Sequence, residues 1–180
     1  MNFKKYIEIT NKFIEDKDRV FCILSLVSDA ANLIEKLEYL KNENSLILIG
    51  IGDNLFSTFR MMKKCGIELD DQPIDIEALK EQINELDKIY TMSEQEVQKS
   101  LVMEVGLISN IVTNYMKHGI DELSEDDKMR IKKSLVSYIV LLMLLVCKYN
   151  FSIDRVLDFN IKKLEQSSKE LNLKVMKDED

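Results

Sequence analysis

Residues that make tight turns are scarce in this sequence of 180 residues, which contains five glycines and a single proline, Pro73. Sheets need many tight turns, whereas helices joined by short loops need few, so this scarcity predicts an all-α fold. Hydrophobic residues make up 46% of the chain and charged residues 32%, a balance typical of a globular protein rather than a disordered one. The length fits one domain or two small units packed together.

Histidine and cysteine are also scarce, which narrows the possible chemistry. His118 is the only histidine, so the sequence does not support a Ser-His-Asp triad or a histidine-rich zinc site. The number of cysteines is odd: Cys22 and Cys147 lie in apolar runs, and Cys65 closes a helical segment. We interpret all three as reduced thiols of a cytoplasmic protein, in preference to a disulfide framework.

Positive charge is in deficit, and long apolar runs are absent. The 25 lysines and arginines against 32 acids give a formal net charge of -7, which argues against nucleic acid as a partner. The most apolar run, Leu135–Cys147, is shorter than the roughly 20 residues that span a bilayer, and it begins just after two lysines. We therefore expect a buried core helix at this run, no membrane partner and no signal peptide.

Apolar residues recur every three or four positions along most of the chain, and this spacing predicts amphipathic helices. Capping signals help to place the helix ends: Ser93 with Glu96 fits a capping box, and Gly66 follows a helix where a left-handed residue is favoured. The expected helices span residues 2–17, 19–42, 45–65, 75–90, 94–117, 129–149 and 153–171. Between and after them we expect a turn at 70–73, an acidic loop at 121–127 and a frayed tail at 174–180.

The helix expected over 45–65 is an apolar run that holds two glycines and one acid. Gly50 and Gly52 each cost on the order of 1 kcal/mol relative to alanine inside a helix, so another backbone or a ligand should approach this helix closely. An unpaired charge among apolar side chains is costly. Asp53 is therefore expected to face a metal or phosphate site, or to pair with a lysine or arginine from elsewhere in the fold.

A second pair of segments repeats this design. LVSDAANLIEKL (26–37) aligns with LVMEVGLISNIV (101–112), and GIGDNLFSTFRMMKKCGIEL (50–69) aligns with SLVSYIVLLMLLVCKYNFSI (134–153). In this alignment Asp29 corresponds to Glu104, and Asp53 corresponds to Ser137.

The alignment predicts a tandem repeat, with unit 1 at residues 1–90 and unit 2 at residues 91–180. Two helical hairpins of one design bury the same kind of face, so we expect them to pack as one compact domain about a pseudo-twofold axis. The alternative is that any two amphipathic hairpins align loosely through their hydrophobic period.

Each half resembles the MazG-like all-α nucleoside triphosphate pyrophosphohydrolase family. Members carry E-E-x-x-E on one helix, E-L-G-D before an apolar run on the next, and N-x-x-K-L on a later helix. GIGDNLFSTFRMMKKCGIEL looks like the E-L-G-D helix with its exit turn, and KYNFSIDRVLDFNIKKLEQ looks like the C-terminal portion. Asn160, Lys163 and Leu164 then stand on the N-x-x-K-L positions. The resemblance covers most of the chain and implies tandem MazG-like helical hairpins.

In that family, four carboxylates from two neighbouring helices hold Mg²⁺, and the enzyme converts a nucleoside triphosphate to the monophosphate and pyrophosphate. Carried over to this chain, the E-x-x-E positions fall on Asp29 and Asn32, and the E-x-x-D positions fall on Gly50 and Asp53. Of the four corresponding positions in the second half, only one holds an acid, Glu104. The three remaining positions hold Leu107, Ser134 and Ser137.

Two hypotheses of function follow. In the first, the protein is a Mg²⁺-dependent nucleoside triphosphate pyrophosphohydrolase with a weakened metal site at Asp29, Asn32 and Asp53, and with Glu104 as a further candidate ligand. Asn160 and Lys163 are then the candidate nucleotide contacts. In the second, the protein is an inactive homologue that binds a nucleotide or a protein partner. The sequence leaves open whether it is an enzyme, and a homodimer is compatible with either hypothesis.

Two of the candidate metal ligands have a simpler alternative. Asp29 and Glu104 are also compatible with ordinary acids on the solvated surface of a helix.

Overall fold

The computed structural model describes residues 3–14, 18–40, 42–67, 91–120 and 122–178, with side chains described up to residue 170. The regular structure of these residues is entirely helical, which confirms the predicted all-α fold class. The elements are α1 (Phe3–Thr10), the 3₁₀ turn η1 (Asn11–Phe13), α2 (Arg19–Tyr39), α3 (Asn44–Lys64), α6 (Glu94–Lys117), α7 (Glu125–Lys148) and α8 (Ile153–Asp178). The expected turn at 70–73 and helix at 75–90 lie outside the described residues.

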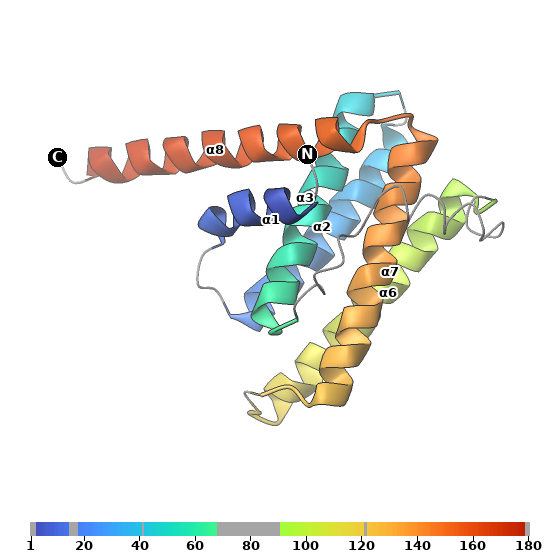
Figure 1. Ribbon diagram of the computed structural model, residues 1–180, viewed down its shortest axis with the longest axis vertical. Coiled ribbons are helices and arrows are strands. Elements are labelled where there is room, and N and C mark those ends of the chain that lie inside the picture. The colour runs from blue at the N-terminus through green and yellow to red at the C-terminus, as the bar shows by residue number, and fades with distance from the viewer. Residues whose placement is uncertain (1–2, 15–17, 41, 68–90, 121, 179–180) are drawn as a thin grey trace.

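Four long helices form a bundle of two hairpins, α2 with α3 and α6 with α7 (Figure 1). The hairpins pack side by side, because α2 also contacts α6 and α3 also contacts α7. The chain then turns sharply: α8 is bent by 109° relative to α7 and crosses the bundle at α3. The short helix α1 packs against α8, so the first helix of the chain meets the last one.

Apolar side chains from the four bundle helices fill a continuous core. Leu26 and Leu33 of α2 and Ile51 and Leu55 of α3 are fully buried within it. Residues 141–146 of α7 are all buried, as expected for the core helix predicted at this apolar run. Among the described residues, no single helix is both long and apolar enough to span a membrane.

Several helix ends lie where the sequence signals predict them. Ser93 caps α6 in a reciprocal capping box, in which its backbone N–H donates to Glu96 Oε2 at 2.6 Å. Gly66 follows α3 with φ of 64°, the left-handed conformation predicted for it. Asn150 follows α7 with φ of 52°. The N–H groups of Gly66 and Asn150 each donate to a carbonyl three residues back at 3.1 Å, so both helices end in the same kind of turn.

The N-terminal helix is shorter than expected. The pattern over 2–17 predicts one helix, but α1 ends at Thr10 and gives way to the 3₁₀ turn. The Thr10 hydroxyl donates to the backbone carbonyl of Tyr6 at 2.9 Å and so occupies an acceptor of the helix. Beyond the 3₁₀ turn, the backbone at Ile14 is extended, with ψ of 99°.

Two helices in the second half are longer than expected. Helix α7 begins at Glu125, inside the predicted acidic loop, because the Ser124 hydroxyl accepts from the N–H of Asp127 and caps the helix. The three acids of the first turn also favour the positive end of the helix dipole. Helix α8 continues to Asp178 through most of the expected frayed tail, and neither glycine nor proline interrupts it.

Candidate functional site

Two helices, α2 and α8, approach α3 closely at its two glycines. A Cβ atom added to Gly52 would lie 2.9 Å from the Cβ atom of Asn160, so α8 crosses α3 at a position that only glycine leaves open. A Cβ atom added to Gly50 would lie 3.7 Å from the Cα atom of Leu33 on α2. A neighbouring helix therefore approaches α3 at both glycines, through the side chain of Asn160 at Gly52 and through the side chain and backbone of Leu33 at Gly50.

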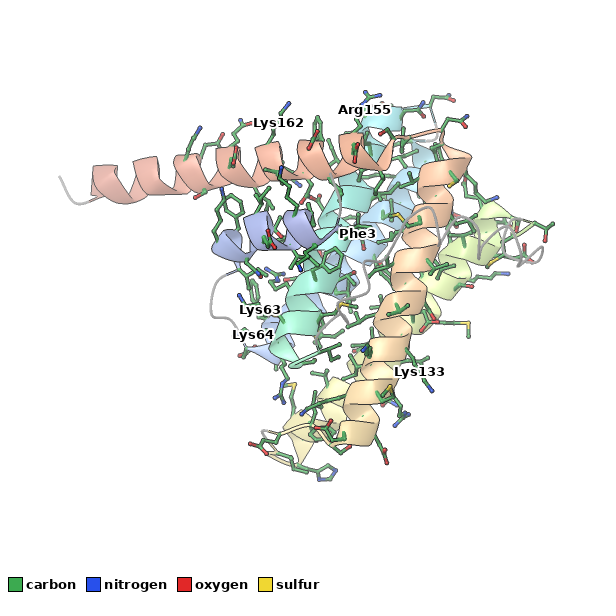
Figure 2. All side chains as sticks on the ribbon, viewed as in Figure 1. Phe3, Lys63, Lys64, Lys133, Arg155 and Lys162 are labelled. Carbon is green, nitrogen blue, oxygen red and sulfur yellow. The ribbon has the colours of Figure 1, made fainter. Side chains whose placement is uncertain are left out.

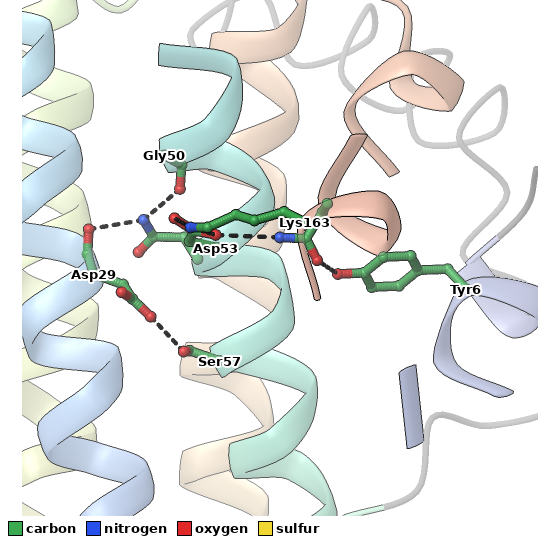
Figure 3. Close-up of polar contacts among 8 residues, drawn as sticks. Tyr6, Asp29, Gly50, Asp53, Ser57 and Lys163 are labelled. Carbon is green, nitrogen blue, oxygen red and sulfur yellow. Dashed lines mark hydrogen bonds and ion pairs between the residues drawn. The ribbon is translucent and has the colours of Figure 1, made fainter. Parts of the chain in front are cut away.

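Asp53 meets α8 beside this crossing (Figure 3). Lys163 Nζ donates to both carboxylate oxygens of Asp53, at 2.7 and 2.6 Å, and Asn160 Nδ2 donates to Oδ1 at 3.2 Å. The Asp53 side chain is 21% exposed and the Lys163 side chain 43%, so the ion pair lies at the edge of the core. Of the alternatives that the sequence left open for Asp53, the structure shows an ion pair with a lysine from a helix that is distant in the sequence.

Asn160 links this ion pair to the first helix of the chain. The Tyr6 hydroxyl donates to Asn160 Oδ1 at 2.6 Å, and both side chains are buried. Burial raises the pKa of the Tyr6 hydroxyl, and the nearby charge of Asp53 raises it further. Tyr6 therefore stays a neutral hydrogen-bond donor that fixes the orientation of the Asn160 amide.

Asn54, the residue after Asp53, forms a second buried network. Its Nδ2 donates to the backbone carbonyls of Asp29 and Gly50, both at 2.8 Å, and its Oδ1 accepts from the Tyr138 hydroxyl at 2.5 Å. Asn54 thus connects α2, α3 and α7. Sequence reasoning missed both Asn54 and Tyr138. The available signal was a polar side chain inside an apolar run, at the position that the repeat aligns with Tyr138.

Asp29 lies on α2 and faces α3. The Ser57 hydroxyl donates to Asp29 Oδ2 at 2.5 Å. Burial raises the pKa of the Asp29 carboxyl, and the charge of Asp53 adds to this increase. The Ser57 hydrogen bond and the positive charges of Arg60 and Lys163 offset part of it. Two acids and two cations therefore converge on one small region.

These charged side chains line an open groove of about 510 Å³ that involves α2, α3 and α8. Helix α2 contributes Phe21, Leu24, Ser25, Ser28 and Asp29, α3 contributes Asp53, Phe56, Ser57 and Arg60, and α8 contributes Lys163. Two of the four predicted metal ligands, Asp29 and Asp53, therefore face the same groove. Asn32 is exposed on α2, and Glu104 is half-buried on α6; neither lines the groove.

The donor set falls short of the four-carboxylate cage that the resemblance implies. The groove offers two carboxylates, and that of Asp53 already accepts three hydrogen bonds, two of them from the Lys163 ammonium. Within the described part of the chain, no cluster of three or more acids, histidines or cysteines is arranged to hold a metal ion. Mg²⁺ would have to compete with Lys163 for Asp53, so these residues fit an ion pair better than a metal centre.

Comparisons of this chain with protein-family models, with curated proteins and with solved structures gave no match. The site is therefore defined by its own residues, above all by Asp53 and Lys163, which lie 110 positions apart in the sequence and are in direct contact.

Proposed function

We propose that this chain is a MazG-like protein that binds a nucleotide in the groove between α2, α3 and α8. The contact between Asp53 and Lys163 carries the proposal. Each residue belongs to a different motif of the resemblance, the GIGD segment or the N-x-x-K segment, and the two motifs meet in one groove. Lys163 and Arg60 give that groove the cationic side chains that phosphate groups require.

Matching helix ends support the tandem-repeat part of this proposal. The Asp18 side chain caps α2 by accepting from the N–H of Phe21, and the Ser93 side chain caps α6 in the same way. Asp18 and Ser93 correspond when the alignment is extended by eight residues toward the N-terminus, and Gly66 and Asn150 correspond within the aligned segments.

A single hydrogen bond also supports the pseudo-twofold relation. Asn54 and Tyr138 correspond in the alignment and bond to each other across the α3–α7 contact. Under twofold symmetry, a residue contacts its own counterpart only near the axis. We infer that the proposed axis passes between α3 and α7 at this bond.

The second candidate function is Mg²⁺-dependent hydrolysis of a nucleoside triphosphate to the monophosphate and pyrophosphate. It is favoured by one observation, that Asp29 and Asp53 line the same groove. Two carboxylates suffice for Mg²⁺ when phosphate oxygens supply further ligands. Because Lys163 forms an ion pair with one of these two carboxylates, that of Asp53, we rank hydrolysis below binding.

Under either candidate function we place the protein in the cytoplasm, which agrees with the free thiols of its three cysteines.

Binding is tested by thermal shift with a panel of nucleoside mono- and triphosphates. A ligand at 100 times its Kd stabilises a protein by about 2.7 kcal/mol, which corresponds to an increase in Tm of roughly 5–10 °C for a chain of this size. Lys163→Met should reduce this shift, because it leaves the charge of Asp53 unpaired beside an anionic ligand. Lys162→Met is the matched control, since Lys162 is exposed on the outer side of α8 (Figure 2). A flat response of the wild-type protein to the whole panel contradicts the proposal.

Hydrolysis is tested separately by assaying pyrophosphate release from canonical and modified nucleoside triphosphates with Mg²⁺ or Mn²⁺. If the protein only binds nucleotides, no pyrophosphate should be released from any of these triphosphates. Turnover by the wild-type protein that is lost in Asp53→Asn would establish the second candidate instead.

A further inference from the structure

Arg60 lies on α3 two turns beyond Asp53 and faces the same groove. Its guanidinium carbon lies 5.2 Å from the ring centroid of Phe21 on α2 and 5.4 Å from that of Phe56 on α3. The charge is therefore held by two aromatic rings. The Nε atom is buried, and no hydrogen-bond acceptor lies within reach of it among the described residues.

This arrangement leaves the guanidinium incompletely satisfied. Aromatic faces stabilise the positive charge but accept no strong hydrogen bond, and an arginine carries five N–H donors. A buried N–H group without an acceptor is costly, and native structures contain few of them. Asp29 is close enough for the Arg60 charge to act on its pKa, but the described contacts of its carboxylate include no hydrogen bond or ion pair with Arg60.

The other charges of the groove indicate what would complete this arrangement. Lys163 is neutralised by Asp53 at 2.6 Å, so the phosphate of a ligand meets a compensated pair at that end. Arg60, in contrast, forms no ion pair with any acid among the described residues. The rise of about 1.5 Å per residue separates Asp53 and Arg60 by roughly 10 Å along the helix axis, which lets a single ligand contact both ends.

We propose that Arg60 is the phosphate-binding residue of the groove, with Phe21 and Phe56 holding its guanidinium in place. This inference rests on the proposed nucleotide-binding function and specifies the orientation of the ligand. The planar guanidinium matches two phosphate oxygens, and the hydroxyls of Ser25 and Ser28, one turn apart on α2, line the same groove as further donors.

The nucleoside part of the ligand then lies toward Asp53, whereas the Asp29 carboxylate, which accepts from Ser57, faces the stretch of α3 between Asp53 and Arg60. Carboxylates repel a phosphate group but accept hydrogen bonds from sugar hydroxyls and base N–H groups. Asp53 at one end of the groove and, at the other, a guanidinium that forms no ion pair with a described residue therefore favour a single direction of binding.

The test is isothermal titration calorimetry of the full chain with inorganic pyrophosphate, with nucleoside monophosphates and with the corresponding free nucleosides. Arg60→Met should weaken binding of both phosphate-containing probes by about 10- to 100-fold, as expected for the loss of a charge-assisted hydrogen bond, and should leave nucleoside binding unchanged. The methionine side chain keeps apolar contacts with the two rings. Arg60→Lys keeps the charge but loses the planar pair of N–H donors, so it should cause an intermediate loss of affinity for these probes. Lys63→Met, at an exposed position of α3 outside the groove, is the control for net charge.

The outcomes separate this inference from the proposed function. If Arg60→Met binds pyrophosphate and nucleoside monophosphates as tightly as the wild-type protein does, the role of Arg60 is overturned and nucleotide binding stands. If the wild-type protein binds pyrophosphate through Arg60 but binds no nucleotide, the anion site is supported and the proposed function fails. If no probe binds the wild-type protein, both proposals are overturned. Circular dichroism of each variant verifies that it is folded.

Discussion

The carboxyl group of Asp29 is half-buried between α2 and α3, and burial is the main reason for its raised pKa. A raised pKa means that the folded protein disfavours the ionised form relative to the unfolded chain. The folded state then binds more protons than the unfolded state, so its free energy of unfolding falls as the pH rises through the two pKa values. Below the ordinary value of about 3.9, where both states are protonated, this penalty is absent.

We predict that Asp29→Asn stabilises the protein at neutral pH. The amide carries no charge to bury and still accepts the hydrogen bond from Ser57. A gain of about 1 kcal/mol raises Tm by roughly 2–4 °C in a chain of this size. Thermal melts followed by circular dichroism at pH 7 should show the increase, and melts near pH 3.5 should not. Asp158→Asn, on the exposed side of α8, should change neither. An equal increase at both pH values would refute the electrostatic explanation.

The same carboxyl group should make anion binding depend on pH. Protonation of Asp29 removes a negative charge close to Arg60 and Lys163, so the affinity of the groove for an anion should rise as the pH falls toward the raised pKa. Sulfate is the appropriate probe because it stays dianionic throughout this range. We predict that calorimetry shows tighter sulfate binding at lower pH in the wild-type protein and a flatter profile in Asp29→Asn. Identical profiles would exclude Asp29 as the titrating group.

At the scale of the helices, two glycines in similar helical settings have opposite surroundings. Gly52 on α3 lies under Asn160, and an added Cβ atom would lie 2.9 Å from the Asn160 Cβ. Gly106 on α6 is exposed, and no atom of the described part of the chain lies within 4 Å of the position where its Cβ atom would be. Both residues are helical and neither has a positive φ, so helix propensity alone would favour alanine at each.

We predict that Gly106→Ala stabilises the protein by about 0.5–1 kcal/mol, the ordinary gain in helix propensity. Gly52→Ala should destabilise it by about 1–3 kcal/mol, because α8 must shift to make room. Urea unfolding of the two variants and the wild-type protein measures both changes. Stabilisation by Gly52→Ala would mean that α8 does not rest on α3 at this residue.

The sequence predicted the helices better than the contacts between them. Local signals such as the Ser93 cap and the left-handed Gly66 placed several helix ends correctly, because capping depends on residues within one turn. The same signals suggested that Asp53 needs a partner. They did not identify Lys163, because that contact depends on the 109° bend between α7 and α8, which no residue near Asp53 specifies.

At the scale of the whole molecule, two buried tyrosines bind the predicted units to each other. Tyr6 of unit 1 donates to Asn160 of unit 2, and Tyr138 of unit 2 donates to Asn54 of unit 1. Helix α8 also packs on α1 and α3, both of which belong to the first unit. Neither unit therefore completes its own polar core, and the two should unfold together.

We predict a single cooperative unfolding transition that both tyrosine substitutions shift without splitting. Tyr6→Phe and Tyr138→Phe each leave a buried amide oxygen without its donor, at a cost of about 1–3 kcal/mol. For a chain of this size, that cost lowers Tm by roughly 2–12 °C. Tyr39→Phe is the control, since Tyr39 is 76% exposed and should have no effect. Differential scanning calorimetry is decisive here: the calorimetric and van't Hoff enthalpies should agree for every variant. A second transition in either core variant would show that the halves are independent units, and the crossing hydrogen bonds would then be incidental to the fold.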